Sequence, residues 1–588
     1  MRRALQALVF ASVVLASVLG AAPAAAAPAD DLRGVIDQHW AWYLKNNPVQ
    51  ATTLGVHTYD TEIGDISLAE QDREAAEASG FLARLKAIPD AGLSPAERVN
   101  KAILARMLAS QVEGNGFGER AMLFTTYSGW HQNFAGLAEG LPFRTRADYE
   151  SYLARLAKYP AYNQAAIEVT RGAVAKGFVQ PCAVLGGFAK TIEGVISTDP
   201  VRSRFYAPFA GARPVDASAA EWTALQARAR ALISGTVEPE YRRFADFYAK
   251  EYAPKCRTSV GASAMPGGAQ WYAYRARVET TTDRTPEQIH ATGLAEVARI
   301  RAEMEAVAKK AGYASREAFV AKLRTDPKYY ATTPEQLLAA AAMTAKTIDG
   351  KMPGLFGRLP RLSYGIRAIP AETAEGTTTA YYAQGSPESG IAGTYYVNTS
   401  KLSQRPLWEL PALTAHEAVP GHHNQIALQQ ELSLPEFRKH AASFTAFVEG
   451  WGLYSERLGI EMGLYDTPEK DMGRLSYEMW RACRLVVDTG LHSQGWTKER
   501  GVAFMRDNTA LTEANIDAEV NRYISWPGQA LAYKTGELKI RELRARAERE
   551  LGAKFDLRRF HDAVLGQGAV PLDVLEAQVV AWIAGEKG

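Results

Sequence analysis

Apolar residues recur along most of this chain at the spacing of one-sided α-helices. Behind Ser94, for example, they follow the i, i+4 spacing of one helix face: Val99, Ile103, Leu104, Met107 and Leu108. Helix starts are marked by a hydroxyl residue with Glu or Gln three positions later, a pairing that caps the first turn: Ser67, Ser94, Thr285, Thr333 and Ser433. The pattern therefore predicts a mainly α-helical protein.

One region breaks this rhythm and predicts strands. Residues 377–384 and 393–398 are rich in Thr, Tyr and Val, and a turn-like segment at 385–390 separates them. We therefore expect a small antiparallel sheet within a mainly α fold. We also expect two parts, an N-terminal helical lobe over 30–270 and a C-terminal lobe over 271–588 that carries the sheet.

The N-terminus has the pattern of a secretory signal peptide. Arg2 and Arg3 precede a weakly polar to apolar run over 4–22, and small residues follow over 24–29. We expect cleavage to remove residues 1–27 and the mature protein to be exported, to a periplasm or out of the cell. A membrane anchor is the alternative, but the run is short for a span and no Cys follows it to carry lipid. Because no later segment has about 18 consecutive apolar residues, we expect no stable membrane span after cleavage.

Charge indicates no nucleic-acid partner. The chain has 67 Lys and Arg residues against 65 Asp and Glu residues, for a net charge of +2. No concentrated basic block gives it the electrostatic footprint of a nucleic-acid-binding surface.

An exported protein can form disulfide bonds, because the compartment that it reaches is oxidising. Cys182 and Cys256 lie in loop-like stretches, whereas Cys483 lies in a helical pattern. We therefore predict a Cys182–Cys256 disulfide and a free, buried Cys483.

The candidate chemistry lies in Thr-Ala-His-Glu-Ala-Val-Pro-Gly-His-His, residues 414–423. In an H-E-x-x-H zinc helix, two imidazoles one turn apart hold the metal and the intervening Glu reaches its water. His416 and Glu417 supply the first half of that motif. We therefore predict a Zn²⁺ site at which Glu417 is the general base.

The second histidine ligand has two candidates. His422 stands six residues after His416, which on a regular helix would turn it ~240° around the axis. Pro420 and Gly421 allow a local bulge that would restore a one-turn relation. His423 faces the same way as His416 without a bulge, but with ~10.5 Å between the α-carbons. We favour His422 as the ligand and give His423 a role behind the ligands or toward substrate.

Glu449 is the predicted third ligand, in a helical stretch 27 residues beyond His422. Glu456, two turns along the same face, is suited to orient a ligand from behind. A solvated helix face is the alternative for an isolated Glu. The aromatic Trp451 and its apolar neighbours indicate burial instead, and a buried carboxylate needs a cation.

These residues resemble the bacterial family catalogued as domain of unknown function 885, whose hallmark is His-Glu-x-x-Pro-Gly-His-His. Further blocks look like those at 449–454, 484–492 and 527–534, and the resemblance spans most of the mature chain. The family is similar to gluzincin metallopeptidases. That similarity implies Zn²⁺, a mostly helical two-lobed body around a cleft, and peptide hydrolysis. One departure is Gly452, where many members carry Ala.

The gluzincin resemblance implies further roles. A downstream Tyr or His donates to the reacting oxyanion in that group, so Tyr533 and His492 are candidates, and Asp488 could orient His492. A core aromatic is the alternative for Tyr533. The group binds peptide along a sheet edge, which residues 393–398 with Tyr396 could provide, although they fit an interior strand as well.

Two cations are candidates for binding substrate. Arg484 and Lys534 lie in the blocks that resemble the family, and either could pair with the C-terminal carboxylate of a peptide. A structural ion pair is the alternative for each.

The sequence therefore predicts an exported zinc metallopeptidase that acts on peptides, short ones included. A hydrolase of a non-peptide amide or ester would use the same groups. A non-enzymatic exported binding protein with a vestigial site is a further alternative. A purely structural zinc site is disfavoured, because such sites use closed, Cys-rich ligand sets.

Overall fold

The computed structural model describes the chain from residue 28 to residue 588, with these gaps: 127, 371–373, 375–376 and 388–389. The predicted signal peptide, residues 1–27, lies outside the described residues. In the part that the structure describes, no helix combines the length and the apolar composition that crossing a membrane requires.

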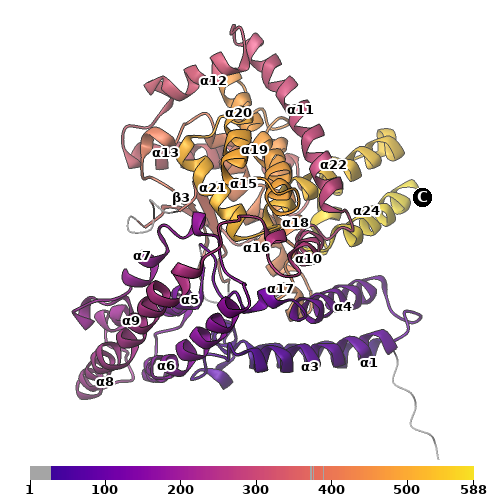
Figure 1. Cartoon of the computed structure of the whole chain (residues 1–588). Helices are drawn as coiled ribbons and strands as arrows, with labels where there is room; N and C mark the ends of the chain where they lie inside the picture. The colour runs from indigo at the N-terminus through magenta and orange to yellow at the C-terminus, as the bar shows by residue number, and fades with distance from the viewer. Residues whose placement is uncertain (1–27, 127, 371–373, 375–376, 388–389) are drawn as a thin grey trace, which may run out of the picture.

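Helices make up most of the fold (Figure 1). Those up to residue 280 are α1 (Pro28–Asn46), α2 (Pro48–Thr53), α3 (Leu68–Ala87), α4 (Pro95–Asn115), α5 (Trp130–Ala135), α6 (Arg146–Ala175), α7 (Phe188–Glu193), α8 (Ala219–Leu232), α9 (Glu238–Phe247) and α10 (Gly268–Thr280). Short 3-10 and π segments lie between several of them.

The later helices carry the predicted metal motif. They are α11 (Pro286–Lys310), α12 (Arg316–Thr325), α13 (Pro334–Asp349), α15 (Leu410–Glu417), α16 (His422–Glu431), α17 (Glu436–His440), α18 (Thr445–Leu458), α19 (Pro468–His492), α20 (Lys498–Asn508), α21 (Glu513–Ser525), α22 (Ala532–Leu551), α23 (Leu557–Leu565) and α24 (Leu572–Lys587).

Most of the predicted helix caps are present. Four hydroxyl side chains accept a hydrogen bond from the backbone N–H three residues on, as expected: Ser67, Ser94, Thr285 and Thr333. The prediction for Ser433 is wrong, because α17 begins at Glu436 with Pro435 before it. The residue before a proline is disfavoured in the α conformation, so Leu434 cannot easily continue a helix from Ser433.

The sheet is mixed, so the prediction of an antiparallel sheet is wrong. Its strands, in the order β1-β3-β2, are β1 (Tyr364–Ala368), β2 (Ala380–Ala383) and β3 (Gly393–Val397). β3 pairs parallel with β1 and antiparallel with β2. Strand β1 was missed because its run Tyr-Gly-Ile-Arg-Ala is short and holds Gly and Arg. Since β3 is the central strand, it offers no free edge for a peptide, and the interior-strand alternative holds.

Helix α19 forms the centre of the part after α10 (Figure 1). Every residue from Met472 to His492 is buried, and the helix packs along α11. A helix buried on all sides is usually apolar all round. This one carries a stripe of buried polar residues at helical spacing: Arg474, Glu478, Arg481, Arg484, Asp488 and His492. One of them, Arg481, pairs with Glu456 beside the candidate site.

The predicted boundary at residue 270 falls inside α10. Figure 1 shows α1 to α9 gathered on one side of the molecule and most of the later helices on the other. The largest cluster of buried apolar residues nevertheless includes residues from both sides of the boundary, such as Tyr241 and Ile300. The division into two lobes around a cleft stays a prediction.

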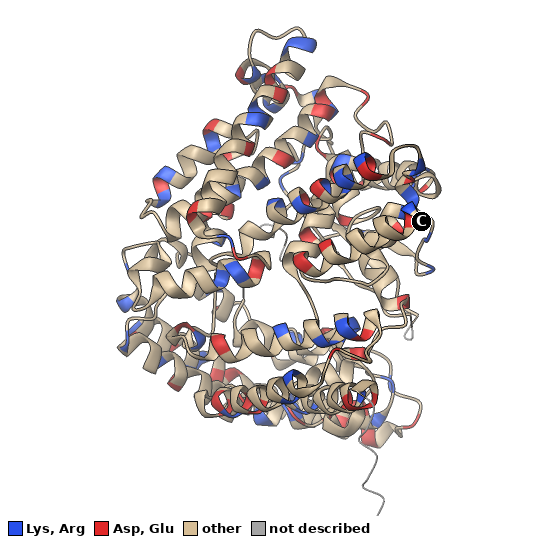
Figure 2. Ribbon diagram, turned by 90° about the vertical axis from the view of Figure 1, so that its right-hand side faces the viewer, with Lys and Arg blue, Asp and Glu red and all other residues tan. Residues whose placement is uncertain are grey.

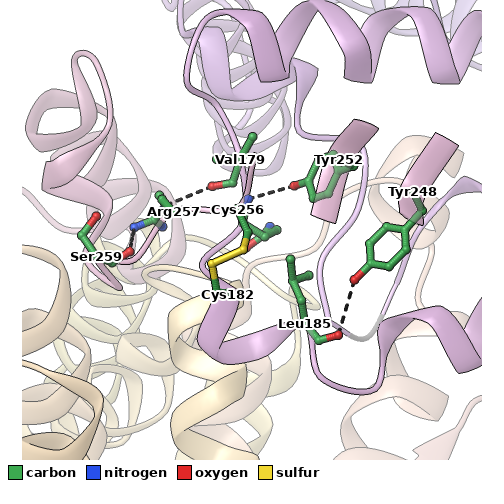
Figure 3. The surroundings of a disulfide bond; sticks show 9 residues. Val179, Cys182, Leu185, Tyr248, Tyr252, Cys256, Arg257 and Ser259 are labelled. Atoms are coloured by element: carbon green, nitrogen blue, oxygen red, sulfur yellow. Dashed lines mark hydrogen bonds between the residues drawn. A yellow bond between two sulfur atoms is a disulfide. The ribbon is translucent and has the colours of Figure 1, made fainter. Parts of the chain in front are cut away.

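Acidic and basic residues are interspersed along the helices in Figure 2. The predicted disulfide is confirmed: Cys182 and Cys256 are bonded, with 5.0 Å between their α-carbons (Figure 3). Cys483 is free and buried in α19, as expected.

Candidate metal centre

Three predicted ligands converge in the structure. One donor atom each from His416, His422 and Glu449 lies within 4.8 Å of the other two. Glu449 Oε2 is 3.3 Å from His416 Nε2 and 3.5 Å from His422 Nε2. The three side chains come from the end of α15, the start of α16 and the first half of α18.

The two histidines meet because the helix breaks between them. α15 ends at Glu417 and α16 begins at His422, and the His416 and His422 ring centroids lie 4.7 Å apart. Gly421 is required at this break, because a Cβ there would lie 1.8 Å from the carbonyl oxygen of His416. The expected bulge is therefore a short non-helical turn, and its place at 418–421 matches the Pro-Gly signal.

His423 lies outside this group of donors. Its Nδ1 is 3.0 Å from the hydroxyl of Tyr382 on β2, and its ring lies 4.6 Å from that of Tyr364 on β1. Burial lowers the pKa of His423 to about 4. The structure thus brings His422, rather than His423, beside His416 and Glu449.

A buried acid supports His416 from behind. Glu456 Oε1 is 2.8 Å from His416 Nδ1, which leaves Nε2 directed at Glu449. Arg481, from the polar stripe of α19, lies 3.3 Å from the same Glu456 oxygen. A carboxylate on the outer nitrogen of a metal-binding His fixes the ring and its tautomer. Glu456 was predicted for this role, whereas Arg481 was not predicted for any.

Electrostatics favour a cation between these groups. Burial alone would lower the pKa of His416, but its hydrogen bonds to Glu449 and Glu456 raise that pKa to about 9. Burial likewise opposes ionisation of Glu449, yet His422 and His416 hold its carboxyl pKa well below the usual range. These side chains therefore keep the Glu449 carboxylate ionised next to a positively charged imidazole, that of His416.

The donor set fits Zn²⁺. Two imidazoles and one carboxylate are the protein ligands of many catalytic zinc sites, which keep a further position open. Gly452 leaves room for the His416 ring, since a Cβ there would lie 2.7 Å from His416 Cε1. His422 departs from the usual pattern in one respect, because its buried Nδ1 has no hydrogen-bond partner among the described residues.

Two further predicted residues lie beside this centre. Glu417 is half-buried at the end of α15, and its negative charge contributes to the raised pKa of His416. Tyr533, at the start of α22, has its ring nearly parallel to the His416 ring with 6.4 Å between centroids. Its hydroxyl accepts a hydrogen bond of 3.2 Å from Arg522, and the Arg484 guanidinium lies 4.2 Å from its ring centroid.

His492 and Asp488 do not take the predicted arrangement. The His492 ring bonds two backbone groups, accepting from the Ala262 N–H at 3.0 Å and lying 2.9 Å from the Tyr523 carbonyl. Asp488 accepts from the Tyr272 hydroxyl at 2.6 Å rather than from His492. Because both nitrogens of His492 are engaged with backbone, the assignment of this ring as an oxyanion donor is corrected to a structural one.

Arg484 and Lys534 take the alternative role of structural ion pairs. Arg484 pairs with Glu519 at 2.9 Å, and both side chains are buried. Lys534 is fully buried and pairs with three acids: Glu296, Glu478 and Glu537. Neither cation is available for a substrate carboxylate in this arrangement. Tyr396 lies half-buried on β3 and stacks on Tyr381, with 4.8 Å between centroids.

Solved structures resemble this chain over almost its full length. A candidate lipoprotein from Colwellia psychrerythraea is 28% identical, with a TM-score of 0.88 over 95% of this chain and 100% of that one. A candidate lipoprotein of unknown function from Shewanella oneidensis is 20% identical, with a TM-score of 0.71 over 95% and 100%. An M32 carboxypeptidase from Deinococcus radiodurans R1, at 14% identity over 89% and 98%, has a TM-score of 0.32, too low to support an argument.

No curated protein matches the sequence. A family model described as "Bacterial protein of unknown function (DUF885)" matches residues 48–579. The predicted family resemblance is therefore confirmed: the chain belongs to the DUF885 family.

Proposed function

We propose that this protein is an exported, zinc-dependent hydrolase of peptide bonds. The observation that carries the proposal is the convergence of His416, His422 and Glu449, with Glu417 directly after the first histidine. That combination supports chemistry rather than a purely structural ion, because structural sites do not need an acid beside the first ligand.

His416, His422 and Glu449 would hold the ion. When bound, Zn²⁺ supplies a Lewis acid and lowers the pKa of coordinated water to about 7. The remaining steps belong to the chain. Glu417 accepts a proton from the attacking water and returns it to the leaving amine. Glu456 holds the His416 ring in one orientation through the 2.8 Å contact at Nδ1.

Tyr533 is the candidate donor to the oxyanion that forms on the substrate. Arg522 donates to the Tyr533 oxygen, so the phenolic proton remains available for donation. Three guanidiniums lie near the Tyr533 ring, each paired with Glu456 or Glu519: Arg481, Arg484 and Arg522. A donor aimed at a developing negative charge lowers the barrier more than it strengthens ground-state binding.

Export is part of the proposal. The signal-like N-terminus supports it, as does the similarity to two candidate lipoproteins. We propose that cleavage removes residues 1–27 during export.

The proposal is tested by metal analysis together with a fluorogenic peptide library, assayed with and without a chelator. We expect about one zinc per chain and peptide cleavage that chelation abolishes and zinc restores. Zinc without turnover of any peptide, ester or amide would instead favour a binding protein. Turnover of esters or non-peptide amides alone would favour the other hydrolase class.

Three variants assign the roles. Glu417→Gln should retain zinc and lose essentially all turnover, because the isosteric amide cannot accept the proton. His422→Gln should lose zinc, whereas the neighbouring His423→Gln serves as the matched control and should retain it. Full activity of Glu417→Gln would overturn the base assignment, and zinc loss in His423→Gln alone would exchange the two histidines.

A further inference from the structure

A second candidate site is a pocket of about 290 Å³ whose lining includes none of the candidate metal ligands. Small-molecule pockets usually have volumes of about 300–1,000 Å³, so this pocket has room for a small ligand. Its walls come from residues 114–125, from Gln180 and Arg257 beside the disulfide, from α10 with the residues just before it, and from residues 524–527.

Aromatic side chains give the pocket flat apolar surfaces. Trp271 and Tyr274 come from α10, and Trp526 comes from the segment after α21. Trp526 is 42% exposed, although tryptophan is on average one of the more buried residues. Aromatic walls with a few polar groups are typical of sites for small organic ligands.

Glu119 is an acid in this wall without a cationic partner. It is 6% exposed, and its Oε1 atom is buried with no hydrogen-bond partner among the described residues. Burial raises the pKa of its carboxyl group. Its own backbone N–H donates to the carboxyl group, so Oε1 is the oxygen that lacks a donor. A buried oxygen without a donor is costly, and a bound ligand could supply that donor.

Arg257 is the cation in the wall without an acidic partner. Its Nε donates to the Val179 carbonyl at 2.9 Å and its Nη1 to the Ser259 carbonyl at 2.5 Å (Figure 3). Nη1 also donates to the Gly261 carbonyl at 2.7 Å. Within the described part of the chain, no carboxylate lies within ion-pair distance of it, and Nη2 makes no hydrogen bond. These carbonyl contacts hold the guanidinium in place but leave its charge unbalanced.

The other two arginines of the pocket are already neutralised. Arg120 pairs with Asp72, and Arg275 pairs with Glu279. Among the described lining residues the pocket therefore has one unbalanced anion, Glu119, and one unbalanced cation, between aromatic walls.

We propose that this pocket binds a free amino-acid zwitterion with an aromatic or large apolar side chain. Its ammonium group donates to Glu119 and its carboxylate accepts from Arg257. Its side chain lies against Trp271 and Trp526. This site goes beyond the proposed zinc chemistry, since no metal ligand takes part in it.

The test is calorimetric titration of the full-length mature protein with L-phenylalanine. EDTA is present throughout, so that chelation of a metal by the amino acid cannot contribute. We expect saturable binding by L-phenylalanine. Its amide lacks the carboxylate and its N-acetyl derivative lacks the ammonium, so each should bind at least about tenfold more weakly for the loss of one charge-assisted hydrogen bond.

Variants locate the binding. Glu119→Gln should weaken L-phenylalanine binding at least about tenfold. The exposed Trp526→Ala should weaken it without a loss of thermal stability. Glu193→Gln removes one exposed acid on α7 and serves as the matched control, with unchanged affinity.

Two results would overturn the proposal. One is the absence of binding up to about 10 mM, which corresponds to less than about 3 kcal/mol. The other is equal affinity for all three compounds. If Glu119→Gln does not fold, the proposal is still tested by the two phenylalanine derivatives on the unmodified protein and by Trp526→Ala. Binding of L-phenylalanine is measured without metal. Its absence would therefore leave the zinc proposal untouched, and failure of the zinc proposal would leave the amino-acid pocket untouched.

Discussion

Two glycines bring the His416 side chain and its backbone into close contact with neighbouring segments. Gly421 lets the chain turn back over the His416 carbonyl, and Gly452 lets α18 approach the imidazole ring. In both places a methyl group would overlap atoms of the proposed ligand. Substitution at either glycine should therefore act on the metal centre.

Gly452→Ala tests this at the ring. The new Cβ would lie 2.7 Å from His416 Cε1, so the ring or the helix must shift by several tenths of an ångström. Many members of the family carry Ala here, which requires a wider spacing between helix and ring than this chain has. At the spacing of this chain we expect zinc affinity to fall about tenfold or more, as it does when groups that orient ligands are altered. Competition with a chromogenic chelator measures this. The control is Gly172→Ala in α6, where no atom lies within 4 Å of the added carbon. An unchanged zinc affinity in Gly452→Ala would show that the ring tolerates the shift.

Zinc affinity should depend on pH through His416. Its pKa of about 9 without metal means that, below pH 9, zinc must displace a proton from this ring. Affinity should rise about tenfold per pH unit up to pH 9 and then level off. Because the pKa is raised, the same group stabilises the metal-free fold fully below about pH 6.5 and loses that contribution as pH rises through 9. Calorimetry in two buffers of different ionisation enthalpy should detect the released proton, and zinc binding without proton release would contradict it.

The metal ligands could be predicted from sequence because the motif spacing and its Pro-Gly break are local signals. Arg481 could not, because it acts on Glu456 from another helix 25 residues away and nothing in its sequence surroundings marks it. His492 was misassigned for a related reason. Its spacing from Asp488 suggested a pair, but two backbone groups from distant segments occupy the ring instead.

At the scale of elements, buried charges join three helices. Lys534 on α22 contacts Glu478 on α19 and Glu296 on α11, and Glu537 on its own helix. Burial would lower the pKa of Lys534, but these carboxylates raise it. The cation is thus a fixed part of the helix packing rather than a site for substrate.

Lys534→Met tests that role. It removes one cation from three buried acids, Glu296, Glu478 and Glu537, which keep arginine partners but lose a charged hydrogen-bond donor. We therefore expect the free energy of unfolding to fall by about 1–3 kcal/mol, measured by urea denaturation. Lys539→Met, on the same helix but in a more exposed pair with Glu576, should cost less than about 1 kcal/mol. A stable Lys534→Met protein with selectively weakened substrate binding would restore the substrate-binding assignment.

Helices were easier to predict than strands for a physical reason. A helix is stabilised by contacts three and four residues apart, so its caps and apolar face are visible in the local sequence. β1 is defined by pairing with β3, about 30 residues later, and its own composition says little. The antiparallel β2–β3 pair is the part of the sheet that sequence revealed.

At the scale of the whole molecule, the Cys182–Cys256 bond closes a long loop in the part of the chain before α10. The two residues are 74 positions apart, and a loop of that length corresponds to about 4 kcal/mol of unfolded-state entropy. We expect the Cys182→Ser, Cys256→Ser double variant to melt at a clearly lower temperature. Cys483→Ala, which breaks no bond, is the control, and equal melting temperatures would show that packing alone holds these segments.

The same disulfide determines when the amino-acid pocket can take its final form. Gln180 and Arg257 each lie within two residues of a bonded cysteine, so two of its walls are fastened by one covalent link. A newly made chain in a reducing cytoplasm lacks that link. If the protein is exported and the pocket binds as proposed, binding should therefore begin only after export, once the disulfide has formed.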